Sequence, residues 1–155
     1  MDYEEKNGFD YFWNGIAPTM KMPVSCYYAP RKRYWAGKLL RHIHSEADIT
    51  IGLTHCDISM SIHGHYNYGI MGLSLRPGNA CVVSTYRVKR REDLWKVTAH
   101  EFFHACGLPH CPKDNPRCLM QDAHGKDTFY RKDKLCKDCE KAIRKIFFGD
   151  DRDKV

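Results

Sequence analysis

Hydrophobic residues recur at helical spacing in two segments of the second half of the chain. The first is EDLWKVTAHEFFHAC, residues 92–106, in which the acids Glu92 and Asp93 suit the first turn of a helix. The second is KDKLCKDCEKAIRKIFFG, residues 132–149, which is amphipathic with the same period. Apolar positions in RYWAGKLLRHIHSEA predict a further helix over residues 33–47.

Strand-like patterns lie among the remaining residues up to residue 88, although the first two dozen residues show no clear period. Between the last two patterns lies RPGN, in which Pro77 and Gly78 suit a type II turn because Gly78 can take a positive φ. These two strands therefore predict a hairpin. The strands that we expect lie in residues 22–29, 48–59, 71–75 and 80–88, and the second of these runs into a loop at its end.

Length and composition indicate one soluble domain. A chain of 155 residues fits a single domain, residues 1–155, with a sizeable core. Its 43% hydrophobic and 28% charged residues are ordinary values for a globular protein. No apolar run approaches the roughly 18 to 20 residues that a membrane span needs, and the acidic N-terminus is unlike a secretory signal. We therefore expect a cytoplasmic protein without a membrane partner.

The net charge of +6 does not by itself indicate a nucleic-acid partner. The basic residues are mostly scattered, and the run RVKRRED, residues 87–93, carries acids at its end. No aromatic residues interleave with it in the pattern that single-strand binding favours. The sequence therefore predicts a solvated loop there and no nucleic-acid partner.

The segment HEFFHACGLPH, which begins at His100, has histidines spaced for one metal ion. His100 and His104 lie four residues apart on the expected helix, so both imidazoles face the same side. Gly107 tolerates the left-handed conformation that ends a helix, which lets His110 supply a third nitrogen. Three histidines leave the fourth position of a tetrahedral zinc open to water, and Glu101 is placed to contact that water. A helix with surface histidines is the alternative.

A group of cysteines forms a second candidate metal site. In CKDC, two sulfurs can face one ion, and two further cysteines complete a closed, structural zinc site. Four reduced thiols or two disulfides are the alternatives. This group consists of Cys111, Cys118, Cys136 and Cys139. The other cysteines lie on apolar stretches and are predicted to be small buried hydrophobic residues: Cys26, Cys56, Cys81 and Cys106.

Residues 98–139 resemble the archaemetzincins, a family of metzincin metallopeptidases. HEFFHACGLPH matches the extended zinc motif of the metzincins, and the following Cys111, CLM and CKDC match the archaemetzincin pattern. A looser similarity covers residues 35–97. The resemblance implies an α+β, metzincin-like domain with a small twisted mixed sheet, an active-site helix and a C-terminal helix. It also implies Glu101 as general base and acid, and Met120 beneath the zinc.

Two Zn²⁺ ions per chain follow from these motifs. The implied ligands are His100, His104 and His110 for a catalytic zinc, and Cys111, Cys118, Cys136 and Cys139 for a structural zinc.

The sequence departs from the family pattern in its loops. Six residues separate Cys111 from Cys118, where about four are typical, and the stretch from Met120 to Cys136 is slightly short. We expect altered loop shapes and unchanged ligands. Asp122 stands where some other metzincins carry a tyrosine, so no tyrosine ligand is predicted.

Other residues of metal-binding or catalytic type are assigned no role. His63 and His65 could bind a metal, but the Gly-containing loop HGH supplies no third partner. The sequence does not indicate whether Tyr130 lies near the site.

We expect a zinc-dependent metallopeptidase that hydrolyses peptide bonds through a zinc-activated water, with Glu101 as the general base. A peptide or protein substrate would lie along an exposed sheet edge, for which residues 71–75 are the candidate. The alternative is a zinc-stabilised peptide-binding module with little or no turnover, which has no need of Glu101. A zinc-finger nucleic-acid binder would leave the three histidines unexplained. We expect the protein to be a monomer.

Overall fold

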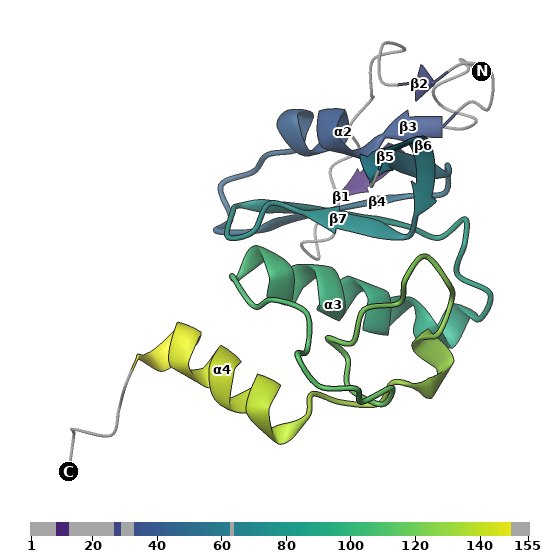
Figure 1. The fold of residues 1–155 in the computed structure, drawn as a ribbon. Helices are drawn as coiled ribbons and strands as arrows, with labels where there is room; N and C mark the ends of the chain where they lie inside the picture. The colour runs from purple at the N-terminus through teal and green to yellow at the C-terminus, as the bar shows by residue number, and fades with distance from the viewer. Residues whose placement is uncertain (1–8, 13–26, 29–32, 63, 150–155) are drawn as a thin grey trace.

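The structure is a computed structural model that describes residues 9–12, 27–28, 33–62 and 64–149 (Figure 1). Its strands form two four-stranded sheets, and the helices α3 and α4 lie below them in Figure 1. This combination of mixed sheets and helices confirms the predicted α+β class. Among the described residues, no helix has the length and apolar character needed to span a bilayer.

The sheet beside α3 has the strand order β1-β4-β8-β7. Its strands are β1 (Phe9–Phe12), β4 (Thr50–Thr54), β7 (Gly72–Ser74) and β8 (Ala80–Ser84). Only β4 and β8 run parallel, and the other pairs are antiparallel. Every residue of β8 is buried because α2 and α3 both pack against this strand. Since β7 is last in the strand order and also packs against α3, it forms the edge of this sheet beside the helix, among the described strands.

The second sheet has the order β2-β3-β5-β6, with β3 and β5 parallel. Its strands are β2 (Tyr27–Tyr28), β3 (Arg33–Trp35), β5 (Ile58–Ile62) and β6 (His65–Ile70). β2 lies within the predicted strand 22–29, whose other residues are outside the described ranges. In the segment 48–59, β4 confirms the predicted strand over Thr50–Thr54, and the loop expected after it is short, because β5 already begins at Ile58.

The predicted helix over residues 33–47 is wrong at both ends. Arg33–Trp35 form β3, and helix α2 spans only Ala36–His42. Tyr34 is fully buried and pairs with β5, so its backbone is extended rather than helical. At the other end, Ile43 is buried with an extended backbone of φ −79° and ψ 126°. Sheet pairing and core packing thus override a periodicity that suits a longer helix.

The hairpin predicted from residues 71–75 and 80–88 is confirmed as β7 and β8, although β8 ends earlier than expected. The predicted type II turn is wrong, because Gly78 does not have the positive φ that such a turn requires. Instead, the Gly78 N–H donates to Ala105 O at the end of α3, over 2.9 Å. This connection is therefore shaped by its contact with α3.

Helices α3 (Leu94–Ala105) and α4 (Lys137–Phe148) confirm the two predicted helices of the second half. The acids of the first predicted helix lie in a short 3₁₀ turn, Arg91–Asp93, that leads into α3. A second 3₁₀ turn, Phe129–Arg131, lies between the two helices. Residues 132–136 precede α4 and are not helical, because they belong to the cysteine-rich segment described below.

Two arginines share one buried carboxylate between the two sheets. Arg33 Nε lies 2.7 Å from Asp57 Oδ2, and Arg87 Nε donates to Asp57 Oδ1 over 2.8 Å. Both Arg33 and Asp57 are buried. The prediction of a solvated loop over residues 87–93 is therefore wrong in part: Arg87 binds Asp57, and Asp93 is fully buried with its carboxylate 2.9 Å from Lys96 Nζ. The Arg87 guanidinium also lies so close to Gly69 that a Cβ there would meet it at 2.0 Å.

We predict that Asp57→Ala destabilises the fold severely, because the buried Arg33 loses its carboxylate and keeps only a neutral acceptor, the Asn67 carbonyl oxygen 2.7 Å from its guanidinium. Removing one member of a buried ion pair costs about 3–5 kcal/mol, which for a domain of this size lowers the Tm by roughly 6–20 °C. Thermal unfolding of the zinc-loaded protein measures this change. The control is Glu140→Ala, which removes the exposed pair with Arg144 and should cost about 1 kcal/mol or less. Equal losses in the two variants would contradict the role given to Asp57.

Candidate active site and metal centres

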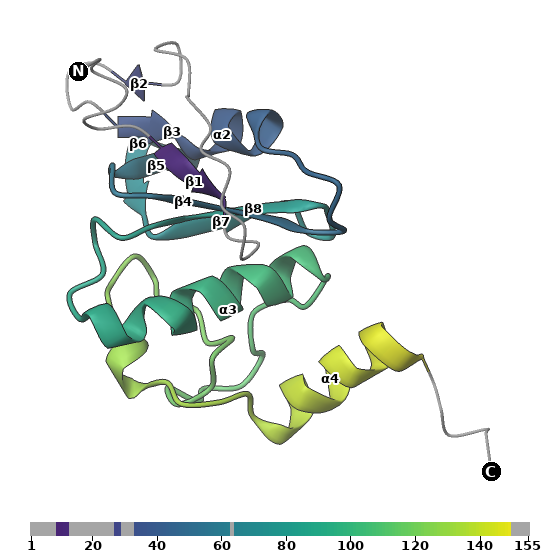
Figure 2. The same ribbon diagram turned by 180° about the vertical axis from the view of Figure 1, so that it is seen from behind.

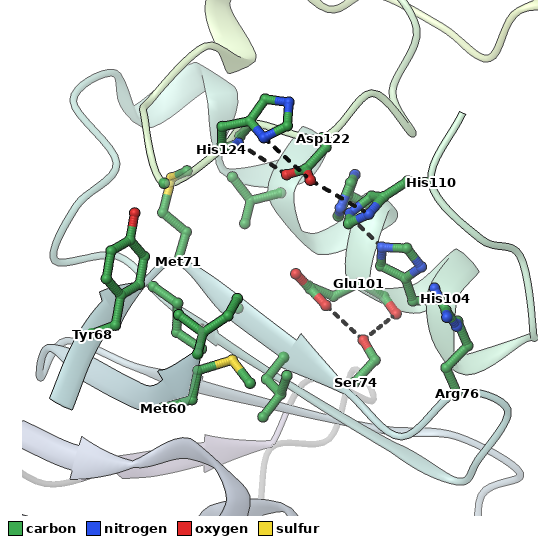
Figure 3. A pocket seen from close by; sticks show the side chains of 18 of the residues that line it. Met60, Tyr68, Met71, Ser74, Arg76, Glu101, His104, His110, Asp122 and His124 are labelled. Carbon is green, nitrogen blue, oxygen red and sulfur yellow. Dashed lines mark hydrogen bonds and ion pairs between the residues drawn. The ribbon is translucent and has the colours of Figure 1, made fainter. Parts of the chain in front are cut away.

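Helix α3 carries His100, Glu101 and His104, which are only 6%, 7% and 7% exposed (Figure 3). The helix packs on β7 and β8 on one side and is flanked on the other by the segment that leads to α4. One helical turn separates the two histidines, so both imidazoles reach the same side of α3. Polar side chains buried in this way need a partner for each polar atom.

Backbone carbonyls orient both histidines of the helix. His100 Nδ1 bonds to Leu119 O and His104 Nδ1 to Leu108 O, each over 2.6 Å. A carbonyl oxygen only accepts, so each ring carries its hydrogen on Nδ1 and a lone pair on Nε2. The two Nε2 atoms lie 3.1 Å apart. Two zinc ligands at tetrahedral angles lie about 3.3 Å apart, so this geometry fits a shared cation and leaves two facing lone pairs unfavourable without one.

His110 lies beside His100 and His104 because α3 ends just before Gly107, as predicted. Gly107 has a φ of +107°, and the Leu108 N–H donates to Phe103 O over 2.9 Å, which turns the chain back. The His110 ring centroid then lies 5.3 Å from that of His100 and 4.6 Å from that of His104. One nitrogen from each of the three rings lies within 4.8 Å of the others. The three histidines therefore form one cluster that could hold a metal ion.

All three imidazoles are uncharged at neutral pH. Burial lowers the pKa of His100 to about 3 and that of His104 to about 4, and it lowers the pKa of His110 as well. A neutral imidazole is the form that binds metal. His110 is more exposed than the other two, and its Nδ1 faces Asp122 Oδ2 at 3.8 Å. A carboxylate thus lies beside the third ring, but at a distance too long for the hydrogen bonds that the backbone carbonyls make to the other two.

The carboxyl of Glu101 is held by strand β7. Ser74 Oγ lies 2.6 Å from Glu101 Oε2 and also 2.6 Å from Glu101 O. A Cβ at Gly72 would come within 2.5 Å of Glu101 Cγ, so this strand position has room only for glycine. Burial raises the pKa of Glu101 to about 7, although the Ser74 hydrogen bond opposes the shift. Such a carboxyl group can accept and release a proton near neutral pH.

The four cysteines of the second motif also converge. Their sulfur atoms lie within 4.8 Å of one another, and Cys111 Sγ is 3.8 Å from Cys136 Sγ. A disulfide needs about 2.05 Å, whereas two thiolates on a tetrahedral zinc lie about 3.8 Å apart. A hydrogen bond from the Cys139 backbone lowers the pKa of Cys136 to about 7, which favours its thiolate. The geometry therefore excludes the disulfide alternative and fits a closed metal site.

The two clusters are joined through residues 118–120. The Cys111 N–H donates to Met120 O over 2.8 Å, and Leu119 supplies the carbonyl that orients His100. Met120 is fully buried and packs in the same apolar cluster as the cysteines. Holding the cysteines together thus also fixes the hydrogen bond on the first histidine.

A cavity of about 790 Å³ opens over the histidines. In Figure 3, Met60, Tyr68 and Met71 lie to one side of Glu101, and Arg76 lies on the other side, next to His104. One end of the cavity is thus lined by large apolar side chains and the other end carries a positive charge.

The remaining sequence candidates fall outside the centre. His65 lines the cavity from β6, and His63 is outside the described residues. Tyr130 is 48% exposed and does not line the cavity. Among the other cysteines, Cys81 is fully buried as predicted, and Cys26 is outside the described residues. The two others are partly exposed: Cys56 and Cys106.

Sequence reasoning missed several residues at the centre. Ser74, Gly72 and Arg76 carry no motif, and only their strand position brings them to Glu101 and His104. Lys132 was also missed: it is 1% exposed, donates to Gln121 O and lies over the Phe129 ring. Burial lowers the pKa of Lys132 to about 8. A lysine in an otherwise polar segment gives no sign that it will be buried.

Comparison with known proteins identifies relatives along most of the chain. No family model matches the sequence. An archaemetzincin of Nanoarchaeum equitans is 31% identical over 129 residues, which cover 82% of this chain and 72% of that protein. An archaemetzincin of Halobacterium salinarum is 29% identical, with 83% and 81% covered.

Solved structures agree with these relatives. The crystal structure of archaemetzincin from Methanopyrus kandleri matches with a TM-score of 0.70 and 28% identity over 82% of this chain and 73% of that one. Archaemetzincin from Archaeoglobus fulgidus, solved in complex with malonate, matches with a TM-score of 0.68 and 25% identity, covering 80% and 78%. Together with the sequence relatives, these matches show that the chain belongs to the archaemetzincins, a family of zinc metallopeptidases.

Proposed function

We propose that this zinc metallopeptidase hydrolyses peptide bonds at the cluster of His100, His104 and His110, with Glu101 as general base and acid. The observation that carries the proposal is the pair of Nε2 lone pairs 3.1 Å apart beside a buried carboxyl group. A zinc ion held by the three histidines would supply Lewis-acid chemistry, polarising the scissile carbonyl and making water nucleophilic near neutral pH.

Glu101 would move the proton. Its Oε2 is held by Ser74, which leaves Oε1 to take a proton from the attacking water and later deliver it to the departing amine nitrogen. A pKa raised to about 7 by burial suits both steps, since the carboxyl is then neither a very weak base nor a very weak acid. A module that only binds peptides would have no use for such a group, so turnover is favoured over the binding alternative.

The substrate would pair with the edge of β7. Ser84 N donates to Met71 O and Leu75 N donates to Ala80 O, so the odd-numbered residues of this strand bond to β8. By the alternation of an antiparallel pair, the backbone N–H and C=O groups of Gly72 and Ser74 point to the open side. An extended peptide could add there as a further strand, close to Glu101.

We propose that Cys111, Cys118, Cys136 and Cys139 bind the second, structural Zn²⁺. The support is the convergence of the four sulfurs within 4.8 Å of one another and the hydrogen bonds that join this cluster to the histidine centre. The described cysteines form no disulfide, which suits the reducing cytoplasm that we propose as the site of action. The single domain, the monomeric state and the absence of nucleic-acid partners stay predictions.

We predict that Glu101→Gln keeps both metals and loses most of its activity. Glu101 is not a ligand in this scheme, and general acid–base groups contribute about 10²- to 10⁴-fold in rate. Zinc per chain and kcat on a peptide library measure the two effects. Loss of zinc, or cleavage as fast as in the parent protein, would show that Glu101 has another role.

We predict that Ser74→Ala lowers kcat by about ten- to hundredfold with little change in KM, because Glu101 loses the hydroxyl that fixes its carboxyl. Zinc content should be unchanged. Ser74→Thr keeps a hydroxyl and should recover part of kcat, whereas a merely structural defect would appear in both variants alike. An unchanged kcat in Ser74→Ala would rule out the positioning role.

We predict that a chelator removes the two metals in separate steps. The proposed catalytic ion has three neutral ligands and an open position, whereas the proposed structural ion has four thiolates and is coupled to folding. Mild chelation should therefore remove about one zinc per chain and all activity while the circular dichroism stays the same. Cys136→Ser with Cys139→Ser should lose the second zinc and helical signal. Two ions leaving together with the fold, or one zinc in the loaded protein, would refute the scheme.

A further inference from the structure

Arg76 lies in the cavity of the histidine cluster without a carboxylate partner among the residues that the structure describes. Other arginines in the described ranges, such as Arg33, Arg87 and Arg117, each contact an aspartate. A guanidinium is charged at any physiological pH and is shaped to bind a carboxylate through two parallel hydrogen bonds. An unpaired one at a substrate cavity therefore points to an anionic group on the ligand.

The position of Arg76 in the hairpin directs its side chain to the active centre. Side chains two residues apart on a strand point to the same face, and Ser74 points to Glu101. The strand remains paired at least to Leu75, whose N–H donates to Ala80 O. Arg76 thus continues the row of Gly72 and Ser74, and Figure 3 shows it beside His104.

The charges around the cavity leave Arg76 available. The acidic groups among the lining residues are Glu101 and Asp122. Ser74 holds Glu101, and Asp122 faces His110 at 3.8 Å and His124 at 3.6 Å on the rim away from β7. Lys132 is buried beneath the centre and adds a further positive charge. The end of the cavity at Arg76 is therefore suited to a negative charge on the substrate.

The direction of a bound peptide decides which side of the scissile bond would carry that charge. Antiparallel pairing is the more stable arrangement for a strand added to an edge. Since β7 runs from Gly72 toward Arg76, an antiparallel peptide places its N-terminal part beside Arg76. At about 3.4 Å per residue, Arg76 lies roughly 7 Å along the strand from Ser74, which holds the Glu101 carboxyl, and roughly 10 Å from the point midway between Gly72 and Ser74.

We propose that Arg76 selects peptide substrates with an acidic side chain two or three residues before the scissile bond. This inference rests on the proposed function, because it requires a peptide paired with β7. The apolar end of the cavity, at Met60, Tyr68 and Met71, would then take a large apolar side chain just after that bond. A parallel peptide would instead bring a carboxylate on the C-terminal side to Arg76, and the experiment separates the two cases.

The test uses matched quenched-fluorescence peptides with leucine after the cleavage site, which mass spectrometry locates. In the main set, the second or third residue before the cleavage site is glutamate, glutamine or lysine. In a further set, glutamate is the second or third residue after the cleavage site. We expect kcat/KM to be about five- to tenfold higher for glutamate than for glutamine before the site, mostly through KM. The preference should shrink as salt is raised from about 0.05 to 0.5 M, because ions screen an exposed pair.

Arginine variants identify the partner. In Arg76→Gln, the ratio of kcat/KM between the glutamate and glutamine peptides should fall to about one. In Arg76→Glu, the lysine peptide should become the preferred substrate. The control is Arg41→Gln, an exposed arginine on α2 on the far side of the sheet, which should keep the parent ratio. A ratio that Arg76→Gln leaves unchanged, or a preference only for glutamate after the site, overturns the proposal.

Binding to a hydrolysis-deficient protein separates this inference from the proposed function. In Glu101→Gln, fluorescence anisotropy should give the same five- to tenfold difference in Kd between the glutamate and glutamine peptides, and Arg76→Gln added to this variant should abolish it. A difference in Kd without cleavage of any peptide by the parent protein would support Arg76 and refute the peptidase function. Cleavage of all peptides at equal kcat/KM would support the peptidase and refute the role of Arg76.

Discussion

The rest of the centre depends on two short hydrogen bonds, from His100 Nδ1 to Leu119 O and from His104 Nδ1 to Leu108 O. They fix the tautomer of both rings and turn both Nε2 lone pairs toward each other in a space that excludes most of the solvent. Without a metal ion this arrangement is unfavourable, because two hydrogen-bond acceptors face each other with no donor between them. It becomes favourable with a cation, so a metal that binds there also stabilises the local fold.

Both carbonyls come from segments whose course is set elsewhere in the chain. Leu108 follows the left-handed Gly107, and Leu119 lies between Cys118 and Met120 in the loop that the cysteine cluster closes. The Leu119 N–H donates in turn to Lys134 O, two residues before Cys136. A closed metal site among the cysteines would therefore act on the open site through the backbone rather than through its own charge. This coupling gives a physical reason for two metal centres within one short stretch of sequence.

The parts of the structure that the sequence predicted are those fixed by local spacing. The i, i+4 histidines on a helix, the ending at Gly107, the CKDC pair and the hairpin of β7 and β8 each follow from neighbouring residues. The failures are those in which distant contacts decide. Arg33–Trp35 pair into a sheet in spite of a helical period, and the turn at Gly78 is shaped by its bond to α3. Ser74 and Lys132 gain their roles only from the strand and the loop that pack against α3, which no spacing in the sequence records.

Strand β7 combines two tasks because the two sets of groups on a strand point in perpendicular directions. The face of the strand at Gly72 and Ser74 is turned to α3: the missing side chain of Gly72 leaves room for Glu101, and the Ser74 hydroxyl donates to its carboxyl group. The backbone groups of the same residues lie in the plane of the sheet and face its open edge. Gly72 and Ser74 would therefore set the position of a paired peptide along the edge, and the same two residues position Glu101. A shift of β7 would thus move the base and the substrate together, which preserves their relative geometry.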